Sequence, residues 1–230
     1  MSDCPVLTID GPSGVGKGTV ARALAGELGW GYLDSGALYR ILAHAATGAG
    51  IDVSNGAAVA QLASELQISF DLLDPEGEVI LLSGENVAKQ LRTETCSRVA
   101  SVIAAKPEVR AAILDRQKQF RQAPGLVAEG RDMGTVVFPD AGLKIFLTAS
   151  PEERAKRRHK QLMHKGLDVS LAALSQQMLE RDQRDINRSE APLVAAEDAV
   201  VVDTTQLQAE QVVVVIRDLA NLRHITGTSV

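Results

Sequence analysis

The sequence has little cysteine, and this scarcity limits the sites that it can build. Only Cys4 and Cys96 occur among 230 residues, too few and too far apart for a zinc site or a disulfide framework. The four histidines lack the spacing of metal ligands. We therefore expect a reducing compartment, the cytoplasm.

Long apolar runs and an excess of basic charge are also missing. No run approaches the roughly 20 residues that span a bilayer, and the amino terminus lacks the basic and apolar regions of a signal peptide. The formal net charge of −5 argues against a broad basic surface for nucleic acid. We expect neither a membrane nor a nucleic-acid partner, and an anionic ligand must be bound by a local cluster of cations.

Short β-rich runs alternate with longer helical stretches, and this alternation predicts the fold class. The runs lie at residues 6–9, 31–33, 126–128, 144–147 and 199–202. Their apolar cores suit strands that are buried on both faces. The pattern predicts an α/β fold with a five-stranded parallel sheet flanked by helices. Helices are expected to start near Lys17, Ser35, Pro151, Ser170 and Gln208, with caps at Ser150 and Ser170.

The alternation changes between about residues 51 and 106. Segments 68–73 and 78–82 flank the turn-forming residues 74–77, which predicts an antiparallel hairpin. A hairpin in a parallel α/β chain indicates a subdomain inserted at an edge of the sheet. We expect one domain over residues 1–230, with the insertion at about 37–106.

The strongest motif is GPSGVGKGT at residues 11–19, which follows a predicted buried strand and opens a helix, the setting required of a P-loop. Its glycines let backbone N–H groups surround phosphate oxygens, and the helix N-terminus adds a favourable field. Lys17 supplies a mobile charge for the β- and γ-phosphates. The alternative is a glycine-rich turn without a ligand. The predicted ATP contacts are Gly11, Ser13, Gly14, Val15, Gly16, Lys17, Gly18 and Thr19.

Gly18 departs from the commonest form of this motif, in which Ser or Thr follows the lysine and binds magnesium. Thr19 is shifted by one position. Two interpretations stay open: Thr19 binds Mg²⁺ directly, or the ion is held by phosphates and water.

A kinase needs a second phosphate site in line with the first. Asp34 and Ser35 follow the second predicted strand, with Arg40 within two helical turns, although Ser35 as a mere N-cap and Arg40 as a solvated charge remain alternatives. Arg131 and Asp132 follow a third strand, where adjacent opposite charges are costly unless paired or used. Phosphate binding by Arg131 and ligand or magnesium positioning by Asp132 compete there with a structural ion pair.

Two helical segments carry further arginines. Arg181, Asp185 and Arg188 are spaced i, i+4, i+7 and share one helix face, which suits phosphate and sugar binding, or else a solvated surface. Upstream, positions 154, 157 and 158 share a face of the helix after Pro151. This segment, about 152–168, is predicted to be a lid over the transferring phosphoryl group, the alternative being a basic helix facing solvent.

Four segments together resemble the bacterial-type cytidylate kinases: GPSGVGKGT, LDSGALYR, AEGRDMGTVVFPDA and ERDQRDINR, in matching order and spacing over nearly the whole chain. The resemblance implies a P-loop kinase that transfers the γ-phosphoryl group of ATP to CMP or dCMP, with Mg²⁺ accompanying ATP. It also implies a monomer. The residues expected to bind the acceptor are Asp34, Ser35, Tyr39, Arg40, Ser101, Arg110, Arg131, Asp132, Arg181, Asp185 and Arg188.

Within that set, the resemblance gives Arg40, Arg131 and Arg181 to the acceptor phosphate. Asp185 meets the ribose, and cytosine is read by Ser101, Arg110 and Asp132. Ser101 and Arg110 would otherwise count as ordinary helix residues. The residues expected to be catalytic are Lys17, Arg131, Arg181 and Arg158, and Arg157 is expected to contact ATP.

Two other functions remain as alternatives. One is another P-loop kinase for a small acceptor such as UMP, dTMP or a non-nucleotide acid. The other is a nucleotide-dependent switch acting through a partner protein, although the Asn-Lys-X-Asp signature of a GTPase is absent from the sequence.

Overall fold

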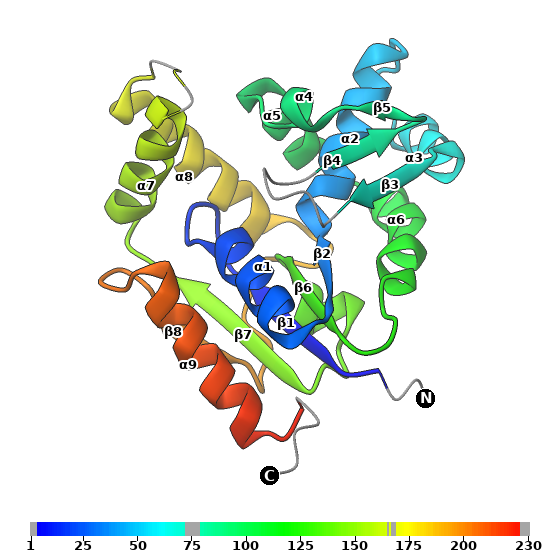
Figure 1. Ribbon diagram of the computed structural model, residues 1–230. Coiled ribbons are helices and arrows are strands. Elements are labelled where there is room, and N and C mark those ends of the chain that lie inside the picture. Colours follow the sequence, from blue (N-terminus) through cyan, green and yellow to red (C-terminus); the bar gives the residue numbers. More distant parts are fainter. Residues whose placement is uncertain (1–3, 72–78, 165, 167–168, 226–230) are drawn as a thin grey trace. The chain divides into compact units, whose positions relative to one another are not determined.

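The computed structural model describes residues 4–71, 79–164, 166 and 169–225 (Figure 1). The chain divides into two compact units. Residues Met1–Leu33 and Phe120–Val230 form the first, here called the P-loop unit, and Asp34–Gln119 form the second, the inserted unit. The insertion expected at about 37–106 falls within the inserted unit.

A five-stranded sheet forms the centre of the P-loop unit. Its order is β2 (Gly31–Asp34), β6 (Leu126–Gly130), β1 (Val6–Asp10), β7 (Leu143–Thr148) and β8 (Val200–Asp203). The β1 strand pairs in parallel with β6 and β7, and β7 pairs in parallel with β8. Every residue of β1 and β6 is buried, which explains their apolar runs. The predicted fold class is confirmed.

Helices α1 (Lys17–Leu28) and α9 (Ala209–Leu222) pack together against the sheet (Figure 1). Leu24 of α1 and Ile216 of α9 are fully buried in one core with Leu7, Ile9 and Ile145 of the strands. The apolar faces of both helices therefore hold the P-loop, which precedes α1, against the carboxyl end of β1.

Helices α7 (Pro151–His164) and α8 (Leu171–Asn187) pack against each other and share a small core of their own (Figure 1). Both predicted caps are confirmed: Ser150 Oγ accepts a hydrogen bond from the Glu153 N–H, and Ser170 Oγ accepts one from the Ala173 N–H. Within the described residues, no helix is both long enough and apolar enough to cross a membrane.

A π-helix, η1 (Met133–Val137), follows β6 and was not predicted from the sequence. The Phe138 N–H donates to the Met133 carbonyl over 2.7 Å, which is the five-residue step of a π-helix. Short π-helical turns occur frequently at functional sites. This one begins directly after Arg131 and Asp132.

The inserted unit contains α2 (Ser35–Gly48), α3 (Gly56–Glu65), α4 (Ala88–Leu91), α5 (Glu94–Ile103) and α6 (Pro107–Gln119). Its antiparallel sheet has the order β3 (Ile68–Asp71), β4 (Val79–Leu82) and β5 (Glu85–Asn86). The predicted pairing of β3 with β4 is confirmed. The predicted turn at 74–77 lies outside the described residues, and the two-residue strand β5 was not predicted.

Candidate active site

The P-loop runs from Gly11 to Gly16 between β1 and α1. Three of its glycines have positive φ, at 145° for Gly11, 82° for Gly14 and 95° for Gly16. At Gly11 a Cβ would lie 2.2 Å from the Leu147 carbonyl oxygen, so no side chain fits there. No side chain of the described residues caps α1 at Gly16. The N-terminal N–H groups of α1 are therefore available to an anion.

Lys17 lies over this loop, and its side chain is buried. Its ammonium group donates to the carbonyl oxygens of Gly11 and Pro12, both over 2.8 Å. Burial, together with the charges of Arg131 and Arg181, lowers the pKa of Lys17 from 10.5 to about 7, against the opposing charges of Glu129 and Asp10. Three cationic side chains thus act on one small region beside the phosphate cradle, which makes it attractive to phosphate groups.

Helix α8 places its charges against the loop after β6. Arg131 Nε donates to Asp185 Oδ2 over 2.9 Å, and Arg188 Nη2 lies 3.7 Å from Asp132 Oδ1. The Arg188 and Asp132 side chains are at most 5% exposed. Burial tends to raise the pKa of Asp185, but Arg131 and Arg181 outweigh it, so the pKa lies below its ordinary value and the carboxylate stays ionised. Arg188 follows the last residue of α8 as its C-cap.

The three arginines expected to share a lid face have different surroundings. Arg154 is buried, pairs with Asp182 and donates to the Ser13 carbonyl over 3.1 Å, so it anchors α7 to the P-loop. Arg157 donates to Thr204, and Arg158 donates to Gln161 over 2.7 Å. Arg154 is therefore a fixed contact of α7. The lid role of residues 152–168 stays a prediction.

Four of the proposed acceptor residues lie at the start of α2, in the inserted unit. Asp34 caps this helix by accepting from the Ala37 N–H, and its other oxygen accepts from Arg40 Nη2 over 2.6 Å. Ser35 begins the helix as predicted, but the alternative that it serves as the N-cap is wrong. Its buried hydroxyl instead accepts from Gln117 Nε2 over 2.7 Å. Tyr39 is buried.

Ser101 and Arg110 also belong to the inserted unit. Ser101 is buried on α5, whereas Arg110 on α6 donates to the Ala104 carbonyl over 3.3 Å. A common acceptor site formed by these residues with Arg131 and Arg181 of the P-loop unit stays a prediction.

Comparisons with known proteins identify the family. A family model described as Cytidylate kinase matches residues 7–222. The chain belongs to the cytidylate kinase family. The resemblance drawn from the four sequence segments is therefore confirmed.

Curated cytidylate kinases are similar over nearly their whole length. The one from Stutzerimonas stutzeri (strain A1501) is 59% identical over 209 residues, covering 90% of this chain and 91% of that protein. The one from Pseudomonas entomophila (strain L48) is 54% identical over 225 residues, covering 97% and 99%. Among solved structures, a gluconokinase from Sinorhizobium meliloti 1021 is 17% identical with a TM-score of 0.47, covering 96% of this chain and 94% of that one.

In this cytidylate kinase family member, a carboxylate lies where the common P-loop motif has a hydroxyl side chain. A Cβ at Gly18 would lie 2.9 Å from Glu129 Oε1. Glu129 is buried and accepts a hydrogen bond from the Tyr32 hydroxyl over 2.8 Å. Thr19, by contrast, is exposed. The space beside Gly18 is thus occupied by a hard oxygen donor of the kind that magnesium prefers.

Three residues of the site were missed by sequence reasoning, and Glu129, just described, is the first of them. Asp10, the last residue of β1, accepts from the N–H groups of Met133 and Gly134 over 2.9 and 2.8 Å. A carboxylate just before a P-loop glycine at a strand end was a signal that could have found it. Thr204, directly after β8, hydrogen-bonds to the P-loop, and no sequence motif marks it.

Proposed function

We propose that the chain transfers the γ-phosphoryl group of ATP to CMP or dCMP, giving ADP and CDP or dCDP. The family supports the reaction and the acceptor. The structural observation that supports it most is that the charges of Arg131 and Arg181 act on Lys17, so three cationic side chains gather at the P-loop. Such a cluster suits phosphoryl transfer, which is catalysed chiefly by positioning and charge stabilisation.

The P-loop binds the donor phosphates. The N-terminal N–H groups of α1 and the flanking glycines surround the β- and γ-phosphate oxygens, and Lys17 leaves its two carbonyl acceptors to meet them. A bound phosphate raises the pKa of Lys17 by adding a nearby negative charge, so the ammonium form persists at neutral pH. Arg158 completes the charge around the transferring group.

The acceptor is held by guanidinium groups. Arg131 and Arg181 bind its phosphate, and Asp185 accepts from the ribose hydroxyls. Arg188 and Asp132, which form a buried ion pair, border the acceptor site. Arg40, Ser101 and Arg110 of the inserted unit complete the site. Asp34 holds Arg40 through their ion pair, and Ser35 and Tyr39 belong to the same acceptor-binding set.

The acceptor phosphate oxygen attacks the γ-phosphorus in line with the departing ADP oxygen, without a covalent enzyme intermediate. A phosphate oxygen is already nucleophilic at neutral pH, so the reaction needs no dedicated general base. The cations near Lys17 stabilise the charge on the equatorial oxygens.

Magnesium bound with ATP neutralises phosphate charge. Glu129, whose carboxylate lies beside Gly18, is the residue of the chain that would hold the ion, together with the phosphates and water. Exposed Thr19 is less suited to a direct contact. We also propose that the chain acts as a monomer in the cytoplasm.

An acceptor panel tests the proposal. ADP release is measured with ATP and each of CMP, dCMP, UMP, dTMP, shikimate and gluconate as acceptor. We expect turnover with CMP and dCMP and a clear preference over UMP, because a site built for the cytosine hydrogen-bond pattern leaves buried groups unpaired with uracil. Turnover with another acceptor alone, or stimulation only by a protein partner, would contradict the proposal.

A further inference from the structure

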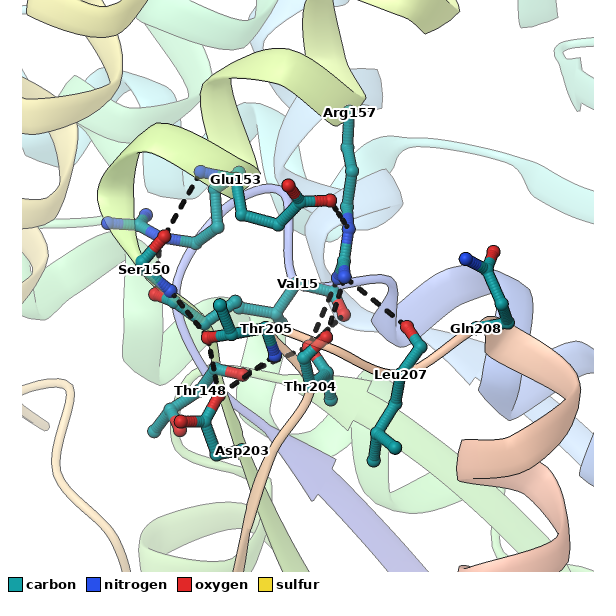
Figure 2. Close-up of polar contacts among 12 residues, drawn as sticks. Val15, Thr148, Ser150, Glu153, Arg157, Asp203, Thr204, Thr205, Leu207 and Gln208 are labelled. Carbon is teal, nitrogen blue, oxygen red and sulfur yellow. Dashed lines mark hydrogen bonds and ion pairs between the residues drawn. The ribbon is translucent and has the colours of Figure 1, made fainter.

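Thr204 occupies a buried junction behind the P-loop, and Figure 2 shows the contacts around it. It directly follows β8 and is 1% exposed. Its hydroxyl lies 3.3 Å from the Val15 carbonyl oxygen of the P-loop and 3.0 Å from the Thr148 carbonyl oxygen at the end of β7. Its N–H also donates to the Thr148 carbonyl over 2.8 Å. One side chain thus connects three segments of the P-loop unit.

Arg157 orients this hydroxyl from the other side (Figure 2). Its Nη1 donates to Thr204 Oγ1 over 3.1 Å, and its Nη2 donates to the backbone carbonyls of Thr204 and Leu207 over 2.6 and 3.3 Å. Its Nε donates to Glu153 over 2.9 Å. Because a guanidinium only donates, Thr204 must be the acceptor toward Arg157. The single hydroxyl proton is then directed toward the two carbonyl oxygens.

Thr148 already receives the Thr204 N–H, so its carbonyl is satisfied without the hydroxyl. The hydroxyl is the group of Thr204 that reaches the Val15 carbonyl, over 3.3 Å, whereas the Thr148 carbonyl keeps the backbone N–H as a donor whichever way the hydroxyl proton turns. The Val15 carbonyl belongs to the peptide unit that carries the Gly16 N–H. In a planar trans peptide these two groups point in opposite directions.

The orientation of this peptide matters for anion binding. Gly16 is the N-cap of α1 and has φ of 95°, a conformation in which glycine offers little resistance to rotation. Its N–H is one of the donors expected to face phosphate oxygens. A hydrogen bond that holds the Val15 carbonyl therefore also fixes the direction of the Gly16 N–H.

We propose that Thr204 is a positioning residue of the ATP site, which holds the Val15–Gly16 peptide in the phosphate-binding orientation, and that Arg157 acts on the donor site through Thr204. The inference rests on the proposed function. It assigns to Arg157 a role different from direct contact with ATP, because all three of its guanidinium nitrogens already donate to protein oxygens among the described residues, in four hydrogen bonds.

The first test replaces Thr204 by Val, which keeps the branched shape and removes the hydroxyl. Titration calorimetry of the full chain with ATP and with CMP separately is expected to show ATP affinity about fivefold weaker, the effect of one lost hydrogen bond, with CMP affinity unchanged within about twofold. Thr204→Ser retains the hydroxyl and should restore ATP affinity to within about twofold. Steady-state kinetics should show the same split, with a raised KM for ATP alone.

The matched control is Thr205→Val in the same loop. The Thr205 hydroxyl accepts from the Ser150 N–H and contacts Asp203, but it makes no contact with the P-loop in the described structure (Figure 2). Its loss should leave ATP affinity unchanged. Equal loss in both Val variants, unchanged ATP affinity in Thr204→Val, or parallel loss of ATP and CMP affinity with lowered melting temperature would overturn the positioning role.

A double-mutant cycle tests the part played by Arg157. If Arg157 acts through Thr204, Arg157→Met combined with Thr204→Val should weaken ATP binding no more than the weaker-binding single variant. Additive losses would show that Arg157 contacts ATP independently and would overturn this part of the proposal. The ATP titrations need no acceptor. If the protein failed to phosphorylate CMP in the acceptor panel, they would still test whether Thr204 positions the ATP site.

Discussion

Asp10 connects the end of β1 to the first turn of η1, so it links the residue before the P-loop to the loop that carries Arg131 and Asp132. Its carboxylate accepts two backbone N–H groups in a buried position. Burial, with a smaller contribution from the charge of Asp132, raises the pKa of Asp10 from 3.8 to about 6 against the opposing effects of those two hydrogen bonds and of Lys17.

This pKa predicts a pH-dependent stability. Between pH 3.8 and about 6 the folded chain keeps a proton on Asp10 that the unfolded chain has released, so rising pH favours unfolding. The stabilising contribution is complete below pH 3.8 and is lost as pH rises through 6. The gap corresponds to about 3 kcal/mol. Urea unfolding of the wild type and of Asp10→Asn from pH 4 to 7 should show the wild-type advantage shrinking as pH rises, and a constant difference would refute the assignment.

Lys17 gives a second prediction at this scale. Lys17→Ala should reduce kcat by at least about a hundredfold, because the charge on the transferring phosphoryl group loses a buried cation. The melting temperature should not fall, since the variant removes a buried charge that Arg131 and Arg181 repel. Coupled ADP release and circular dichroism provide the two readouts. Near-normal turnover in a folded variant would remove Lys17 from the mechanism.

At the scale of elements, α8 has two chemically different faces. One turns Asp182 and Asp185 inward to pair with Arg154 and Arg131, while Arg184 on the other is exposed. The i, i+4 spacing of Arg181 and Asp185 correctly placed both residues away from the exposed face, and their role in binding the acceptor stays a prediction. The sequence alone could not name the partners, because Arg131 lies 54 positions away from Asp185.

These two faces of α8 predict that substitutions on the inner one weaken binding of the acceptor nucleotide selectively. Arg181→Ala and Arg131→Ala should each weaken CMP binding about tenfold or more through loss of a charged phosphate contact, with ATP affinity within about threefold of wild type. Arg184→Ala, on the exposed face, is the control and should change neither. Titration calorimetry with each nucleotide alone decides the matter, and selective loss of ATP affinity would contradict the assignment.

At the scale of the whole molecule, the sequence predicted what depends on local pattern. Buried parallel strands have continuous apolar runs, and the P-loop has its glycines at fixed positions, so both were found. The hairpin followed from turn residues between two β-rich segments.

What the sequence did not predict depends on contacts between distant residues. The π-helix η1 is held by Asp10, 123 positions earlier in the chain, and Thr204 contacts Val15 across 189 positions. The start of α2 at Ser35 was predicted correctly, but the sequence left Ser35 open as an N-cap because Asp34 and Ser35 are both good caps. The strand β5 has two residues, too few to give a periodic pattern.

The carboxylate beside Gly18 constrains which residue can follow Lys17. A single codon change from glycine to serine would restore the commonest phosphate-binding motif, but the added side chain would meet Glu129, which Tyr32 holds in place. The Glu129 carboxylate would then have to swing aside and its hydrogen bond with Tyr32 would have to rearrange. A serine at position 18 and the present placement of Glu129 therefore exclude each other, so changing one calls for a compensating movement of the other.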